Sequence, residues 1–127
     1  MKSFIRLFAF LASLALPLFV WAASVPFDQA AFDKAVAAGE PVVVQFHADW
    51  CPTCKAQAPL VAQVLAAPKM KSVTLFVADF DKEKALKKTL KVSSQSTFVV
   101  FKGGKEVSRS TGETTRAAIE ATFTKAL

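Results

Sequence analysis

Two cysteines, Cys51 and Cys54, are the residues of this 127-residue chain whose type and spacing point most directly to chemistry. They follow an apolar run and stand at the start of a helical pattern. Residues three apart in a first helical turn have β-carbons about 5 to 6 Å apart, so a disulfide between them can open and close with little backbone motion. The free N–H groups and positive dipole end of a helix stabilise a thiolate and lower a cysteine pKa from about 8.5 to roughly 3.5 to 7.5. Cys51 is therefore the expected nucleophile.

Three other roles are open to a cysteine pair of this spacing. A structural disulfide that closes a loop of four residues would contribute only about 2 kcal/mol. A structural zinc site needs four ligands, and His47 is the only histidine of the chain. Two unlinked buried thiols do not suit the neighbouring Trp50, Pro52 and Lys55. The pair favours redox chemistry, because this spacing near a βαβ pattern is typical of it.

The sequence around the cysteines alternates helix and strand patterns. The β-branched run Val42–Phe46 predicts a central strand that is covered on both faces. Asp28 as N-cap, with Phe27 and Phe32 at the spacing of a hydrophobic staple, predicts a helix over Gln29–Ala38. The other expected elements are a helix that starts at the cysteines and contains Pro59, a strand over Val73–Ala78, a helix over Lys82–Leu90, hairpin strands over Thr97–Phe101 and Glu106–Ser110, and a helix from Thr114 or Thr115 to about Lys125.

This order of elements predicts one α/β domain over residues 23–127, with a central mixed sheet, helices on both faces, and a C-terminal β-hairpin plus helix. Residues 1–22 have the pattern of a cleaved signal peptide, with basic Lys2 and Arg6, the apolar run Leu7–Val20, and small residues from Ala22 on. The alternative is an uncleaved membrane anchor, but the run is shorter than the roughly 20 residues that a spanning helix needs.

The net charge of the chain excludes few functions by itself. The chain carries 16 Lys and Arg against 10 Asp and Glu, and loss of Lys2 and Arg6 with a signal peptide would reduce the formal charge from +6 to +4. Nucleic-acid binding would favour basic residues interleaved with aromatic ones, whereas here the lysines gather on the helix over 82–90. We expect a solvated helix face and a monomer that binds no nucleic acid.

The segment that contains the cysteines resembles the active-site segment of the thioredoxin family. It reads Ala-Asp-Trp-Cys-Pro-Thr-Cys-Lys over residues 48–55, and Ala58-Pro59 follows. The resemblance extends over about Asp28–Leu127, through Asp79-Phe80-Asp81, Phe101-Lys102-Gly103-Gly104 and Gly112. The Ala-Asp-Trp-Cys form particularly resembles the periplasmic carboxyl-terminal domain of the membrane electron transporter that feeds reductant outward.

The resemblance implies a thioredoxin fold and dithiol-disulfide exchange with no cofactor other than the redox-active disulfide Cys51-Cys54. In that chemistry the Cys51 thiolate attacks a substrate disulfide, a mixed disulfide forms, and Cys54 resolves it. The resemblance also implies that the loop Gln95-Ser96-Thr97 binds substrate backbone. Ser96 stands where family members carry a cis-proline, and a cis bond before a non-proline residue costs about 2.5 to 4 kcal/mol, so we expect a trans or strained loop. Slower release of mixed disulfides and some affinity for a metal or cluster would follow, although we assign no metal ligands.

Three further positions depart from the family pattern. Gln45 stands where many thioredoxins have a buried acid, and Val77 where a lysine often pairs with it. Gln45 either satisfies a buried hydrogen bond or leaves Cys54 harder to deprotonate. His47 either points at the cysteines and favours a thiolate when protonated, or is a surface residue.

The residues next to the cysteines complete the predicted site. Trp50 is expected to form an exposed apolar platform for partner chains, or else to pack in the core. Pro52 at the first helical turn needs no N–H partner, and Thr53 offers no charge to tune the potential. Together these sequence features predict an exported, periplasmic oxidoreductase that acts as reductase or electron relay on thiol or disulfide proteins. A membrane or periplasmic donor would supply its electrons. A binding module that captures thiol partners or a metal without turnover is the alternative.

Overall fold

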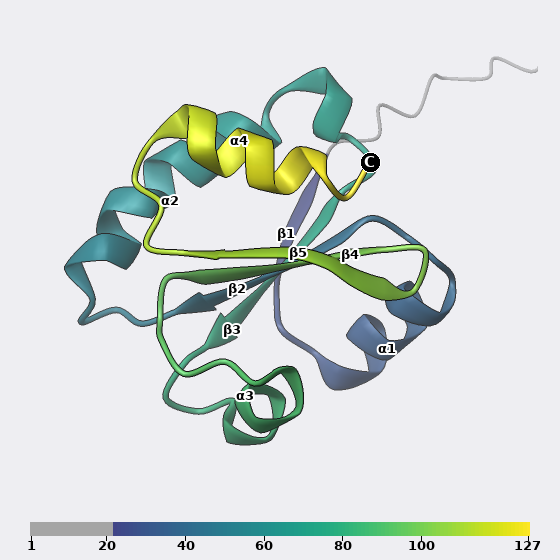
Figure 1. The fold of residues 1–127 in the computed structure, drawn as a ribbon, viewed down its shortest axis with the longest axis horizontal. Coiled ribbons are helices and arrows are strands. Elements are labelled where there is room, and N and C mark those ends of the chain that lie inside the picture. The colour runs from purple at the N-terminus through teal and green to yellow at the C-terminus, as the bar shows by residue number, and fades with distance from the viewer. Residues whose placement is uncertain (1–21) are drawn as a thin grey trace, which may run out of the picture.

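Residues 22–127 are described by a computed structural model, in which five strands form one sheet with helices on both faces (Figure 1). The predicted signal peptide lies outside the described residues except for Ala22. Within the described part of the chain, no helix is both long and apolar enough to cross a membrane. The strands are β1 (Ala23–Pro26), β2 (Val42–His47), β3 (Thr74–Asp79), β4 (Thr97–Lys102) and β5 (Lys105–Thr111), and the helices are α1 (Gln29–Ala37), α2 (Pro52–Leu65), α3 (Lys84–Leu90) and α4 (Arg116–Thr124), with a 3₁₀ turn at Pro68–Met70.

The sheet has the order β1-β3-β2-β4-β5 and is mixed, as predicted. Strands β1, β3 and β2 run parallel, whereas β4 is antiparallel to both β2 and β5. Strand β2 is therefore central, and all but its last residue are buried. The position of β2 fixes where the chain emerges at His47, four residues before the first cysteine.

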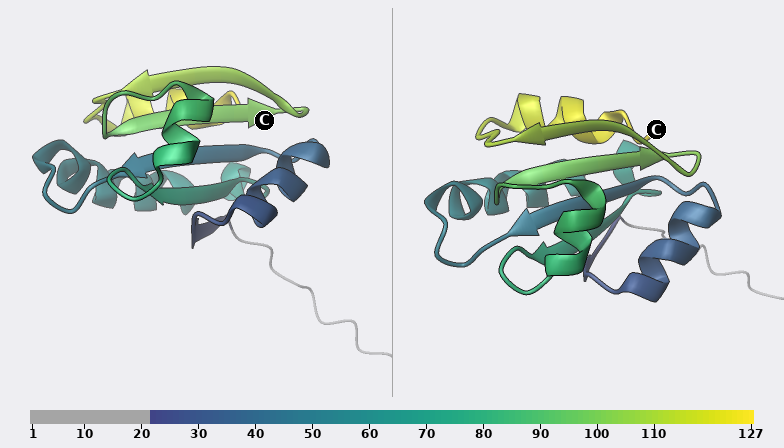
Figure 2. Two further views of the ribbon diagram at one scale, coloured as in Figure 1. Left: turned by 90° about the horizontal axis from the view of Figure 1, so that it is seen from below. Right: turned by 60° about the horizontal axis from the view of Figure 1, so that its bottom comes forward.

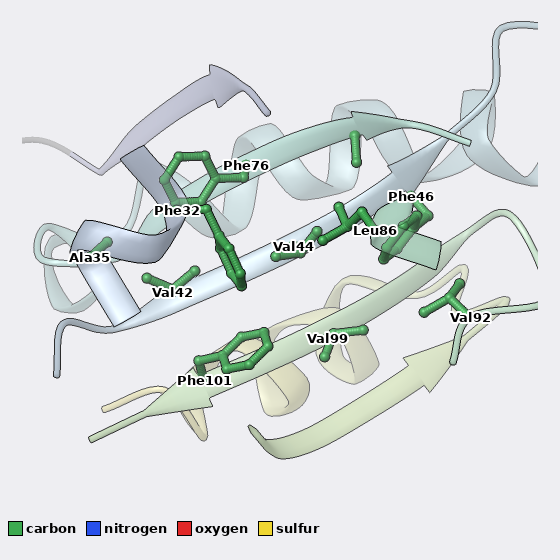
Figure 3. Close-up of a cluster of buried hydrophobic side chains, with 11 residues drawn as sticks. Phe32, Ala35, Val42, Val44, Phe46, Phe76, Leu86, Val92, Val99 and Phe101 are labelled. Carbon is green, nitrogen blue, oxygen red and sulfur yellow. The ribbon is translucent and has the colours of Figure 1, made fainter. Parts of the chain in front are cut away.

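The two faces of the sheet carry separate apolar cores. Helices α1 and α3 cover one face, where Phe32 and Leu86 pack against side chains such as Val44 and Phe76 (Figure 3). Helices α2 and α4 cover the other face, where Val61 and Phe123 belong to the second core. Both views of Figure 2 show α3 in front of the strands and α4 behind them. The predicted α/β arrangement with helices on both faces is confirmed.

Local signals explain where most helices begin. The Asp28 side chain accepts a hydrogen bond from the Ala31 N–H at 2.8 Å, and the Phe27 and Phe32 rings lie 5.6 Å apart, which confirms the predicted cap and staple. The Thr115 side chain caps α4 in the same way. Helix α2 continues through Pro59 without interruption.

Two elements differ from the sequence prediction. Strand β1 was not predicted, because four residues ending in a proline show no periodicity; it forms by pairing along β3. Helix α3 begins at Lys84 rather than Lys82, because Asp79 Oδ1 accepts the N–H groups of Asp81 and Lys82 and holds the chain in a turn.

Candidate active site

The two cysteines lie where the predicted strand-to-helix junction puts them. Cys51 is the N-cap of α2, and its sulfur accepts the backbone N–H of Cys54 at 3.3 Å. Pro52 occupies the first turn, where its missing N–H costs nothing. The nucleophile predicted from the sequence is thus at the positive end of the helix.

The sulfurs of Cys51 and Cys54 do not form a disulfide, and both cysteines are buried. Cys51 is 2% exposed and Cys54 is fully buried, in a small cluster with Ala48 and the half-buried Phe80. Phe80 itself lies beneath the Lys87 ammonium, 3.8 Å from the ring centroid. The structure therefore shows a dithiol in which both cysteines are almost closed to solvent.

Ser96 joins the loop before β4 to both cysteines. Its Oγ lies 3.3 Å from Cys51 Sγ and 3.0 Å from Cys54 Sγ. No peptide bond among residues 22–127 is cis, and Ser96 has a φ of 62°, in the left-handed region that a serine rarely adopts. The expectation of a trans or strained loop is met on both counts, and the cost of this conformation is of order 1 kcal/mol or more.

The surroundings of Cys51 lower the pKa of its thiol. Burial alone raises that pKa, but hydrogen bonds from the Ser96 hydroxyl and the Cys54 backbone N–H outweigh it, with smaller help from the side chains of Cys54 and Gln95. The net result is a pKa of about 7, below the ordinary value. The Cys51 thiolate therefore forms at a lower pH than the thiolate of an ordinary cysteine.

Gln57 is a site residue that the sequence did not reveal. It is fully buried on α2, and its Nε2 donates to the carbonyls of Ser96, at 3.3 Å, and Glu113, at 2.9 Å. The Ser96 carbonyl also accepts the Gly112 N–H at 3.0 Å. A glutamine in an otherwise unremarkable helix gives no sequence signal for this role, which is to tie the Ser96 loop to the helix that carries the cysteines.

Gln45 and Val77 are neighbours in the sheet, as their family counterparts would be. They are paired in the register of β2 and β3, and both line a cavity of about 270 Å³ beside α2. Gln45 is 4% exposed. Its side chain lines the cavity, and both roles considered for it, a buried hydrogen bond or a Cys54 that is harder to deprotonate, stay predictions.

His47 lies in a surface pair. Its Nε2 is 3.0 Å from Asp49 Oδ1, and the His47 side chain is 27% exposed. Among residues 22–127, no three His, Cys, Asp or Glu side chains gather into a group that could hold a metal. The geometry favours the surface interpretation of His47 and brings no third ligand to the cysteines.

The remaining predicted residues differ in what they offer a partner. Trp50 is 58% exposed, and its Nε1 donates to Asp81 Oδ2 at 2.7 Å, so the ring lies on the surface and not in the core. Thr53 and Gln95 are half-buried. The hydroxyl of Thr97 is buried and bonds to the Ser94 carbonyl and to Thr111, so its side chain is part of the hairpin, and contact of its backbone with substrate stays a prediction.

The fold, a mixed sheet covered on both faces, and the buried Cys51-Cys54 pair at a helix N-terminus define a class of thiol-disulfide oxidoreductases. Residues 23–125 match the Thioredoxin family, so the chain belongs to the thioredoxin family. Proteins of this family act on thiol or disulfide groups of protein substrates, and this chain is a thiol-disulfide oxidoreductase of that class.

Named relatives agree with this assignment. The chain is 39% identical over 85 residues to thioredoxin of Chlamydia trachomatis, a match that covers 67% of this chain and 80% of the relative. It is 37% identical over 82 residues to thioredoxin-2 of Saccharomyces cerevisiae, covering 64% and 77% of the two chains. The crystal structure of Trxlp from Edwardsiella tarda EIB202 superposes with a TM-score of 0.78 at 39% identity, over 80% of this chain and 99% of that one.

The lowered pKa of Cys51 predicts how its reactivity changes with pH. Alkylation by iodoacetamide should rise through a midpoint near pH 7, because the reactive thiolate replaces the thiol as the pH passes the pKa. Below the midpoint the rate should fall about tenfold for each pH unit, the slope of a single titration. Mass spectrometry of alkylated peptides gives the rate, and a Cys51→Ser variant should lose this midpoint. A midpoint at 8.5 or above would contradict the lowered pKa.

The bridging role of Gln57 predicts that it stabilises the fold. Replacing Gln57→Ala should lower the free energy of unfolding by about 1 to 3 kcal/mol, since it leaves the Glu113 carbonyl without its donor and opens space beside the Ser96 loop. Urea unfolding of the reduced protein measures this. Gln63→Ala on the exposed side of the same helix is the matched control, with an expected change within about 0.5 kcal/mol. Equal effects of the two substitutions would contradict the role.

Proposed function

We propose that this protein is an exported reductase or electron relay that exchanges disulfides with periplasmic proteins through its Cys51-Pro-Thr-Cys54 motif. Cys51 attacks, and Cys54 resolves the mixed disulfide. Electrons come from a membrane or periplasmic donor, and the protein works as a monomer. The narrower resemblance of Ala48-Asp49-Trp50-Cys51 to the outward-facing domain of the membrane electron transporter supports the relay role.

The observation that carries this proposal is the Cys51 sulfur at the N-cap of α2 with a pKa of about 7. Nucleophilic cysteines of thioredoxins have pKa values of about 7, whereas a strong oxidant of the same motif has about 3.5 because its reduced form is stabilised. A nucleophile of pKa near 7 is therefore suited to the reducing direction.

Trp50 supports action on proteins. Its ring is 58% exposed beside the cysteine and is held by the hydrogen bond to Asp81. A large, ordered and partly apolar surface at this point suits contact with a partner chain.

A second candidate is a binding module that captures thiol partners or a metal without turnover. The burial of Cys51 and the left-handed backbone of Ser96 favour it, because both can slow the release of a captured partner. The two candidates differ in turnover, which an assay can measure directly.

The first test is the reduction potential of the Cys51-Cys54 pair in glutathione buffers. We expect a value near the reducing end of the family, about −270 mV, and not the roughly −120 mV of an oxidant. In parallel, substoichiometric protein should accelerate the reduction of insulin by dithiothreitol, and a Cys51→Ser variant should not. A potential near −120 mV would reverse the direction. Complexes that form once and do not turn over would favour the binding module.

Export generates a separate prediction. Residues 1–22, with their basic and apolar pattern, should export a fused reporter enzyme that is active only outside the cytoplasm. Cleavage should occur after Ala22. Amino-terminal sequencing of the mature protein locates the cleavage site. Replacing Leu11→Arg should interrupt the apolar run and abolish export, with Lys2→Arg as the control that keeps the charge. A reporter that remains inactive on the wild-type segment would contradict export.

A further inference from the structure

The Ser96 hydroxyl contacts the sulfurs of both cysteines. Ser96 Oγ is within hydrogen-bond distance of Cys51 Sγ, at 3.3 Å, and of Cys54 Sγ, at 3.0 Å, and Ser96 is only 3% exposed. A serine hydroxyl has a single hydrogen to donate, together with two lone pairs that can accept. It can therefore donate to one of the two sulfurs at a time and accept from the other.

Building on the exchange reaction proposed above, we propose that the Ser96 hydroxyl is a catalytic group that donates its hydrogen to the Cys51 thiolate before attack and to the Cys54 thiolate afterwards. The hydroxyl rotates between the two sulfurs while its backbone stays in place. Ser96 therefore helps to ionise each cysteine at the step that needs it.

The Ser96 hydroxyl acts at both steps of the reduction of a substrate disulfide. The Cys51 thiolate, which accepts the Ser96 hydrogen, attacks one sulfur of the substrate disulfide, and the other substrate sulfur leaves with the bonding electron pair as a thiolate. Cys51 is then a neutral disulfide sulfur and no longer holds the Ser96 hydrogen strongly. The Cys54 thiol passes its proton to the expelled substrate thiolate, and the hydroxyl turns to stabilise the Cys54 thiolate. Cys54 attacks Cys51 Sγ, the mixed disulfide breaks, and the second substrate thiolate leaves, so that the protein is oxidised and the substrate reduced.

The two cysteines do not depend on Ser96 equally. Within the described part of the chain, Cys51 Sγ also accepts the backbone N–H of Cys54, whereas Ser96 Oγ is the one hydrogen-bond partner of Cys54 Sγ besides Cys51 itself. The other side chains in the sulfur cluster are those of Ala48 and Phe80, which carry no charge. Gln45 cannot accept the Cys54 proton as a carboxylate would. Cys54 is accordingly the cysteine with fewer other hydrogen-bond donors beside its sulfur.

The backbone of Ser96 is held firmly enough for such a role. Its N–H donates to the Phe46 carbonyl at 2.8 Å, and its carbonyl accepts from both Gly112 and Gln57. These contacts maintain the left-handed φ of 62° and leave the hydroxyl free to rotate between the sulfurs. The strained backbone is consistent with a site where position matters more than local stability.

Stopped-flow reaction of the reduced protein with dithiobis(nitrobenzoic acid) separates the two steps, because attack by Cys51 releases one coloured thionitrobenzoate and resolution by Cys54 releases a second. Ser96→Gly and Ser96→Ala both remove the hydroxyl, but glycine accepts a positive φ and alanine does not. We expect both variants to slow the second release by about tenfold or more, the effect of losing a hydrogen bond to a charged group. The first release should slow less, because Cys51 keeps the helix N–H. Ser94→Ala, at an exposed serine of the same loop, is the control and should match the wild type.

Each outcome decides the proposal. If the second release is normal in Ser96→Gly and slow only in Ser96→Ala, the backbone conformation is the cause and the hydroxyl switch is wrong. A normal second release in both variants overturns it as well. Failure of the proposed reductase function looks different: the wild type would give both releases with the small reagent but would not turn over insulin.

Discussion

The contact between Cys51 Sγ and the N–H of Cys54 is the constraint on which the rest of this protein depends. Through this contact the reactive Cys51 is also the N-cap of α2, so the nucleophile lies at the point where the strand-to-helix junction ends and the helix begins. Central strand β2 fixes the start of that junction, and α2 packs on the sheet to fix its end. A sulfur with 2% exposure would ordinarily hold its proton. Here the helix end and the Ser96 hydroxyl reverse that tendency.

Much of the fold follows from patterns of near neighbours in the sequence. The β-branched run of β2, the Asp28 cap of α1 and the two glycines of the β4–β5 hairpin each specify their own element, and alternating units then restrict the topology. Strand β1 lacks such a pattern, because four residues become a strand only by pairing with β3. The start of α3 depends on the Asp79 carboxylate, whose turn competes with the helix for the same N–H groups.

The residues of the active site also differ in whether the sequence alone could reveal their roles. Cys51, Cys54 and Trp50 could be assigned from spacing and resemblance, because their roles depend on adjacent residues. The contacts of Ser96 with both sulfurs and of Gln57 with two carbonyls join residues 39 to 56 positions apart. They depend on how the loop before β4 settles against α2, which periodicity does not encode. Thr97 in the same loop differs from Ser96, because its hydroxyl bonds to Thr111 of the hairpin and not to a cysteine.

The surface position of Trp50 has a consequence for observing the protein. The chain has no tyrosine, and Trp50 is the only tryptophan among residues 22–127. Its indole lies next to Cys51, is open to solvent and is anchored to Asp81 in the turn after β3. The ultraviolet emission of the domain therefore comes from a single ring at the site of exchange. Any event that covers this ring or breaks its anchor changes the fluorescence of the whole domain, which carries its own optical probe.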